Sequence, residues 1–144
     1  MKLALLGSLL LAAVVACGPK PEPVSPVLPD VPFEQLNHDQ KIQFMKEVVE
    51  PAMRALFESH DPEKFANFGC KTCHGADADR GHYHMPSDEL PKLNFSDMSK
   101  FEQRDIDFMQ IEVKPLMAKL LKETEHSPEN PRGFGCLHCH QQVK

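Results

Sequence analysis

Two short stretches of this sequence share the pattern Cys-x-x-Cys-His, and together they hold four of its five cysteines. They are residues 70–74 and residues 136–140. Thiols form thioether, disulfide and metal bonds, and imidazole is the commonest metal ligand among side chains. A histidine directly after a Cys-x-x-Cys pair is typical of covalent heme attachment, in which the two thiols add to the heme vinyl groups and the imidazole binds the iron.

We therefore predict two covalent c-type hemes, each with its own residues. The attaching thiols would be those of Cys70, Cys73, Cys136 and Cys139. The proximal iron ligands would be His74 and His140, bound through Nε2, while Nδ1–H donates to a backbone carbonyl or to water.

Three other uses of these cysteines compete with heme. A zinc site built from two such pairs usually has a shorter separation between them. Thioredoxin-like redox chemistry needs a βαβ context, which the sequence lacks. Two structural disulfides are compatible with an exported protein, but they leave the histidine after each pair unexplained.

The fifth cysteine, Cys17, follows an apolar N-terminal stretch. Lys2 supplies a positive charge, residues 3–15 are largely apolar, and Val-Val-Ala precedes Cys17. This arrangement resembles the lipobox of bacterial lipoproteins. The resemblance implies that residues 1–16 are a signal peptide, that Cys17 becomes the acylated N-terminus, and that the protein is anchored to an envelope membrane facing the periplasm. Gly18 somewhat favours the outer membrane. Residues 17–34 form the lipidated cysteine and a tether, which carries six of the chain's 13 prolines and is predicted to be an extended spacer.

The remaining chain contains one pattern twice, in predicted units 35–95 and 96–144. The residues that recur 64 positions later are Ile42, Phe44, Met45, Pro51 and Met53, matched by Ile106, Phe108, Met109, Pro115 and Met117. Phe-Gly precedes each Cys-x-x-Cys-His motif as well. Repetition at this length indicates duplication of a heme-binding unit.

Each unit is predicted to be a helix, a turn and a second short helix. Apolar residues from Ile42 to Phe57 follow helical spacing, and Asn37 with Gln40 is a capping-box pattern. The two prolines inside these patterns predict a kink or a division of each helix. Asp61-Pro62 and Ser127-Pro128 predict the start of the second helix. Strand signals are absent, so the expected fold is all-α: two repeated helix–turn–heme-helix units packed around two hemes.

The sixth iron ligand is less well specified, because only residues 141–144 follow the second motif. It must come from upstream unless the iron stays open. If the repeat is structural, the candidates are paired: Met45 with Met109, Met53 with Met117, or His60 with His126. We predict Met53 and Met117, with His60 and His126 as the alternative. Met85, which precedes a proline, could serve the first heme alone, and His38 and His138 are expected to face solvent or heme propionates.

On these motifs the chain resembles multiheme c-type cytochromes, specifically a diheme lipoprotein. The helix–turn–Cys-x-x-Cys-His unit is also similar to that of the cytochrome subunit of photosynthetic reaction centres. That resemblance implies that each heme lies along a helix that donates the distal methionine.

Charge and composition narrow the choice among function classes. The formal charge of −5 argues against a nucleic-acid partner and is complementary to the charge of a basic redox partner. Aromatic residues make up only 7% of the chain, so hemes would supply apolar filling that the side chains lack. The sequence therefore predicts an electron carrier rather than an enzyme. The alternatives are a small peroxidase-like heme enzyme or a heme-based sensor with one open iron.

Overall fold

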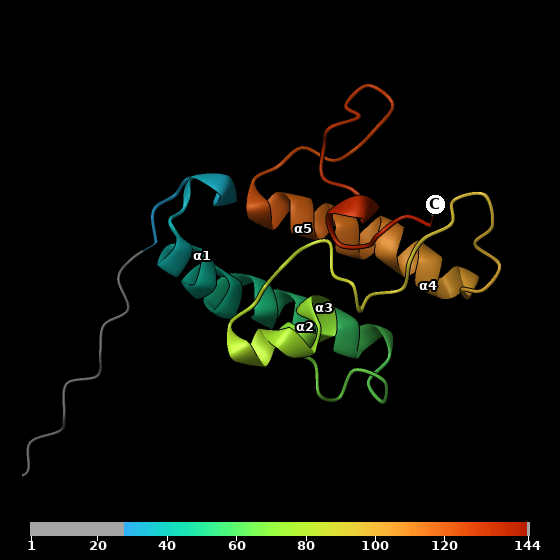
Figure 1. The fold of residues 1–144 in the computed structure, drawn as a ribbon, viewed down its shortest axis with the longest axis horizontal. Helices are drawn as coiled ribbons and strands as arrows, with labels where there is room; N and C mark the ends of the chain where they lie inside the picture. Colours follow the sequence, from blue (N-terminus) through green and yellow to red (C-terminus); the bar gives the residue numbers. More distant parts are fainter. Residues whose placement is uncertain (1–27, 144) are drawn as a thin grey trace, which may run out of the picture.

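The structure is a computed structural model that describes residues 28–143 (Figure 1). The signal peptide, Cys17 and most of the tether lie outside the described residues. Within residues 28–143 the secondary structure is helical, and the only β-type pairings are isolated bridges between Leu93 and Gln142 and between Glu125 and Phe134. The all-α prediction is therefore confirmed for this part of the chain.

Two long helices form one layer. The first comprises α1 (His38–Phe44), the π-helical segment η2 (Met45–Val49) and α2 (Glu50–His60). The second comprises α4 (Gln103–Asp107), the π-helical segment η4 (Phe108–Val113) and α5 (Lys114–Leu121). They run in opposite directions side by side, with α2 against η4 and α5 against η2 (Figure 1).

The first long helix begins as the sequence predicts. The Asn37 side chain accepts a hydrogen bond from the Gln40 backbone N–H, and the Gln40 side chain accepts one from the Asn37 N–H, both at 3.0 Å. This reciprocal pair satisfies two backbone donors that the first helical turn leaves free.

The two prolines produce π-helical turns rather than breaks. Pro51 and Pro115 lie in the first turn of α2 and α5, directly after η2 and η4. Just before each proline, the Glu50 N–H donates to Met45 O, and the Lys114 N–H donates to Met109 O, each one residue further back than in an α-helix. Because proline has no N–H and its ring crowds the preceding turn, a locally widened helix accommodates it without ending the helix.

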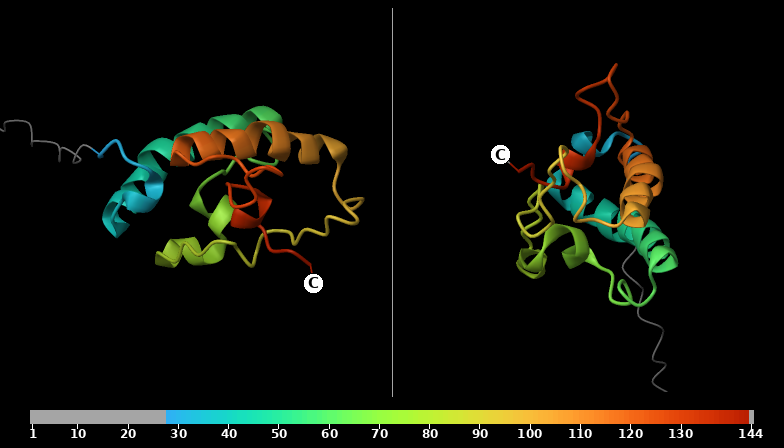
Figure 2. Two further views of the ribbon diagram at one scale, coloured as in Figure 1. Left: turned by 90° about the horizontal axis from the view of Figure 1, so that it is seen from above. Right: turned by 90° about the vertical axis from the view of Figure 1, so that its right-hand side faces the viewer.

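The Cys-x-x-Cys-His motifs form a second layer on one side of the helix pair (Figure 2). The first motif is the helix α3 (Cys70–His74), followed by the 3₁₀-helix η3 (Ala76–Arg80). The second contains the 3₁₀-helix η5 (Cys136–His138), and another 3₁₀-helix, η1 (Phe33–Gln35), precedes α1. No helix among residues 28–143 is long and apolar enough to span a bilayer.

The predicted helix starts at Asp61-Pro62 and Ser127-Pro128 are wrong. Asp61 Oδ1 accepts from the Lys64 N–H at 3.0 Å and Ser127 Oγ accepts from the Asn130 N–H at 3.1 Å, as N-caps do, but turns and bends follow instead of helices. The chain must reverse after each long helix to bring its Phe-Gly pair back onto the core. A continued helix would carry it away, so tertiary packing overrides the local signal.

Two clusters of buried side chains join the layers. The larger contains Val49, Met53, Phe57, Phe68 and Phe108, and the smaller contains Ala118, Leu121 and Phe134. Each large apolar side chain buried in this way contributes about 1.5–3 kcal/mol. Phe44, Met45 and Met117 lie half-buried and each packs against both clusters, so the two long helices share one core.

Candidate functional site

The first motif is fastened to the core by the residues just before it. Phe68 is buried, and its ring centroid lies 4.9 Å from that of Phe57. The Gly69 N–H donates to Thr72 Oγ1 at 3.1 Å, and the Thr72 N–H donates to Gly69 O at 2.9 Å, which begins α3. The phenylalanine thus fixes where the motif starts, and the threonine inside it closes the first turn.

The second motif repeats this construction with a different capping residue. Phe134 is buried in the smaller cluster, and the Gly135 N–H donates to His138 Nδ1 at 3.0 Å. His138 therefore occupies the place of Thr72. Its ring lies 4.9 Å from that of Phe134 and is exposed, so its side chain serves the local turn while facing solvent.

All four motif cysteines are free thiols in this structure, so it contains neither of the two disulfides considered as an alternative. Burial, followed by the neighbouring cysteines Cys139 and Cys70, raises the pKa of Cys73 to about 12. Burial raises the pKa of Cys139 to about 11, with a further contribution from Cys136. Burial also raises the pKa of Cys70, and Glu50, whose carboxylate lies 3.4 Å from its sulfur, raises it further.

The raised pKa values of Cys70, Cys73 and Cys139 indicate which thiol chemistry the motifs favour. Redox-active Cys-x-x-Cys pairs depend on a lowered thiol pKa, because the thiolate is the nucleophile. Here the shifts run the other way. Nor do three or more Cys, His, Asp or Glu side chains among residues 28–143 converge in a way that could hold a metal ion.

The two proximal candidates occupy different surroundings. His74 is half-buried, burial lowers its pKa, and its Nδ1 is buried with no hydrogen-bond partner among the described residues. Its ring stands edge-on to that of Tyr83, with centroids 5.4 Å apart. His140, by contrast, has Nδ1 at 2.9 Å from the backbone carbonyl oxygen of Pro91. His140 therefore shows the predicted Nδ1 contact and His74 does not.

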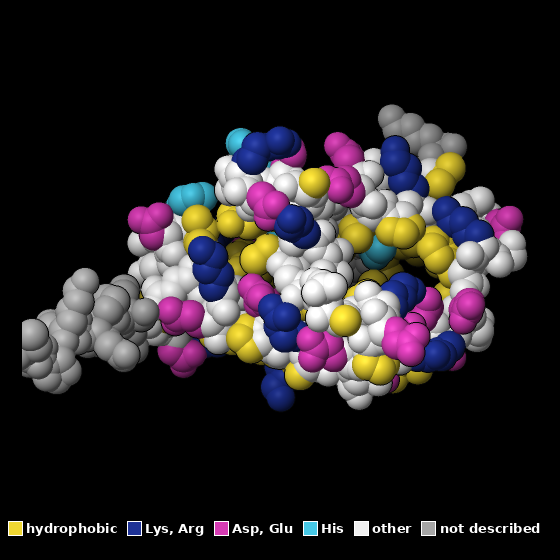
Figure 3. Space-filling model, turned by 90° about the horizontal axis from the view of Figure 1, so that it is seen from below, with side chains coloured by type: hydrophobic (Ala, Val, Ile, Leu, Met, Phe, Trp, Pro, Cys, Tyr) yellow, Lys and Arg dark blue, Asp and Glu magenta, His cyan; other side chains and the backbone are white. Residues whose placement is uncertain are grey.

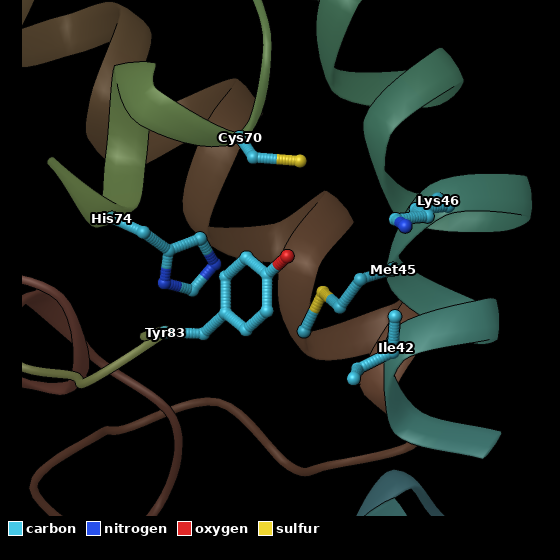
Figure 4. Close-up of a pocket in the computed structure, with 6 residues that line it drawn as sticks. All are labelled: Ile42, Met45, Lys46, Cys70, His74 and Tyr83. Atoms are coloured by element: carbon cyan, nitrogen blue, oxygen red, sulfur yellow. The ribbon is translucent and has the colours of Figure 1, made fainter. Parts of the chain in front are cut away.

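A small apolar cavity adjoins the first motif (Figure 4). The side chains that line it come from the first long helix, from α3 and from the loop after it: Ile42, Met45, Lys46, Cys70, His74 and Tyr83. In Figure 4 the Tyr83 ring lies between the His74 imidazole and the Met45 thioether. A planar group could occupy that place only if Tyr83, the chain's single tyrosine, moved aside.

The predicted distal residues lie elsewhere. Met53 is only 3% exposed and packs within the larger cluster, while Met117 is half-buried against both clusters. His60 stacks on Phe108 with centroids 3.9 Å apart, and its Nε2, the atom that would bind iron, lies 2.8 Å from Asp105 Oδ1. His126 is exposed, and its backbone N–H donates to Phe134 O at 2.9 Å.

The other candidates are at the surface. His38 and Met85 are exposed, and Met85 lies in the loop that also carries Tyr83. The molecule is hollowed on the face seen in Figure 3, where hydrophobic side chains border the hollows and a histidine lies at the edge of one.

Sequence reasoning missed three residues of one loop that contact the motifs or the backbone just after them. They are Tyr83, Glu89 and Pro91, all in the loop between the two motifs. The repeat does not include this loop, so comparing the two units gave no signal. From this loop the sequence offered only Met85 as a candidate ligand.

No family model matches this chain, and neither a curated protein nor a solved structure does.

Proposed function

We propose that this protein is a membrane-anchored diheme c-type cytochrome that transfers electrons in the bacterial envelope. The observation that carries the proposal is that both Cys-x-x-Cys-His motifs are complete and have thiols free of disulfides. Each is preceded by its own Phe-Gly pair, whose buried phenylalanine attaches it to the same side of the helix pair. Heme attachment explains the histidine after each pair, which disulfides and redox-active thiols leave unexplained.

The motif thiols and imidazoles fit two hemes, with the exception that Tyr83 would have to move aside for the first. Cys70 and Cys73 would attach the first and Cys136 and Cys139 the second, with His74 and His140 holding the irons. When bound, heme supplies a one-electron iron couple whose potential depends on its axial ligands and surroundings. The chain's part is to hold the imidazoles and to exclude water with apolar side chains. On this proposal the two long helices, each with its proline and π-helical turn, are the matching halves of two heme units.

The two motifs would place their hemes close together. Cys139 contributes to the raised pKa of Cys73, and both cysteines pack against the shared core. A short distance between cofactors suits electron transfer. The charge of −5 suits weak, salt-sensitive docking of a basic redox partner.

The test is heme content measured on the purified protein. We expect acid–acetone extraction to leave heme on the chain and the intact mass to include two hemes. Changing Cys70 and Cys73 to Ser should remove one heme, as should the matched change of Cys136 and Cys139. An apo mass would refute the proposal.

The first heme's sixth ligand can be decided by comparing two methionines. Met53 is the sequence prediction, and Met45 is the methionine that lines the cavity next to His74. Methionine ligation of ferric heme gives a weak absorption band near ~695 nm, and its loss also lowers the potential. Met45→Ala and Met53→Ala are a matched pair on one helix, and the ligand is the one whose loss removes part of the band. If neither does and the ferrous protein binds carbon monoxide, one iron is open, as in the sensor or peroxidase-like alternative.

Anchoring is tested by Cys17→Ser. We expect this variant to appear in the soluble fraction with unchanged heme content, because the tether separates the anchor from the helices. If it stays with the membrane after a salt wash, the lipobox assignment is wrong.

A further inference from the structure

The loop between the motifs contains a segment, residues 87–93, that we call the strap. It lies along the second motif. The Ser87 N–H donates to Cys139 O at 3.0 Å, the Leu93 N–H donates to Gln141 O at 2.8 Å, and the Val143 N–H donates to Leu93 O at 2.9 Å. Ser87 and Leu93 are both buried. The strap is therefore fixed to the chain on both sides of His140.

Toward the first motif the strap makes a different contact. Glu89 Oε1 accepts from the Ala76 N–H at 2.8 Å, just past the end of α3. This bond involves the backbone after His74 and not its ring. The ring instead faces Tyr83, and its Nδ1 is the one buried side-chain nitrogen or oxygen without a partner in the described part of the chain.

Among the described residues, His140 thus has an acceptor for its Nδ1–H and His74 has none. A proximal imidazole that donates Nδ1–H to a carbonyl is a more basic ligand, because the acceptor draws positive charge from the ring. A more basic ligand stabilises ferric over ferrous iron and so lowers the potential.

We propose that the strap makes the two hemes unequal, with Pro91 as the positioning residue that gives the heme on the second motif the lower potential. The inference rests on the proposed function, because it needs both hemes to be present. With both hemes bound, one-electron transfer from the heme held by His140 to the heme held by His74 would be downhill.

A redox titration of the whole protein, followed optically, tests this. We expect two one-electron steps that differ at least tenfold in equilibrium constant, which is about 59 mV. The single-heme variants of the cysteine pairs assign the steps, and the lower step should belong to residues 136–140. If the lower step belongs to residues 70–74, or if the steps coincide, the inference fails.

The strap's role is tested with Leu93→Pro and its control Leu93→Ala. Both shorten the buried side chain, but only proline removes the N–H that donates to Gln141 O. We expect Leu93→Pro to raise the lower step toward the upper one and to leave the upper step unchanged, while Leu93→Ala moves neither. Equal shifts in both variants would contradict a role for the strap's hydrogen bonds.

A gentler pair covers the case in which Leu93→Pro does not fold. Val143→Pro removes the N–H that donates to Leu93 O, whereas Val143→Ala keeps it, and Val143 is 46% exposed. The same one-step shift is expected in the proline variant alone, and its absence would overturn the inference. Intact mass separates the two levels of the argument: two hemes with the wrong order of potentials refute only the strap, and missing hemes refute the proposed function.

Discussion

The two Cys-x-x-Cys-His regions begin alike and end differently. Each begins with a buried phenylalanine and a glycine whose N–H is capped two residues into the motif, by Thr72 in one case and His138 in the other. After the histidines the resemblance stops. The first motif turns away at Gly75 into η3, and the second runs on beside the strap.

This difference separates what the repeat specifies from what the unrepeated loop adds. The repeated residues determine where each motif is attached and how its first turn closes. The loop, which occurs once, places Tyr83 beside His74 and Pro91 beside His140. Two nearly identical sequence motifs thus acquire different surroundings.

The largest expected effect is the loss of one heme at a time. If each motif holds its own heme, as proposed, changing both cysteines of either motif to Ser should halve the heme absorbance. We expect the Cys70 and Cys73 variant to lose more thermal stability, since Cys73 packs against the larger cluster and Cys139 against the smaller one. Pyridine hemochrome spectra and thermal melts measure both. Loss of both hemes from one variant would show that the motifs are not independent.

The phenylalanine anchors give the next effect. Phe68→Ala and Phe134→Ala each remove a side chain that is 4–5% exposed, and such changes cost about 3–5 kcal/mol. We expect Phe68→Ala to cost more, because its ring also packs against Phe57. Denaturant midpoints give the order. A larger loss for Phe134→Ala would mean that the smaller cluster contributes more than its size suggests.

The exit of the first motif gives a smaller effect. Gly75 and Gly81 both have φ of +81°, where any side chain is strained by about 1–2 kcal/mol. A Cβ at Gly75 would also collide with the Glu89 carboxyl group, whereas nothing lies within 4 Å of one at Gly81. Gly75→Ala should therefore destabilise more than its control, Gly81→Ala, and displace Glu89 from the Ala76 N–H. Denaturant midpoints measure the difference, and equal costs would mean that Glu89 simply moves aside.

The fold was largely predictable from the sequence. Helical spacing, the Asn37 cap and the absence of strand signals predicted the long helices correctly. The consequence of the prolines was predictable only in part, because a π-helical turn depends on whether packing keeps the helix continuous. The predicted helix starts at Asp61 and Ser127 were wrong. Both side chains do cap the following turn, but no helix continues from it, because the chain must return Phe68 and Phe134 to the core.

The site was less predictable. Motif spacing identifies the six residues of the two Cys-x-x-Cys-His sets, because that chemistry is local in sequence. Tyr83 and Pro91 reach the histidines through the path of a loop, and no spacing rule encodes that path. The distal pair Met53 and Met117 stays a prediction; Met45 lines the cavity because η2 lies opposite α3, which only the packing of the layers reveals.

The smallest expected effect concerns a contact found in one unit only. His60 Nε2 lies 2.8 Å from Asp105 Oδ1, joining the end of α2 to α4, whereas the matching His126 is exposed. The hydrogen bond from His60, followed by Lys64, lowers the pKa of Asp105. A lowered folded-state pKa contributes stability that is present above the unfolded value of about 3.9 and is lost as pH falls through the folded value.

Asp105→Asn should therefore destabilise the protein at neutral pH and approach the stability of the native chain in acid. Because the Asp105 side chain is 38% exposed, we expect less than about 1 kcal/mol. Asp107→Asn in the same helix, whose carboxylate binds Gln103 and not a histidine, is the control. Denaturation at a series of pH values measures the difference. If the proposed hemes are bound and His60 keeps its bond to Asp105, the heme spectrum should not change with Asp105→Asn. A change in the spectrum would instead support the alternative in which His60 is a distal ligand.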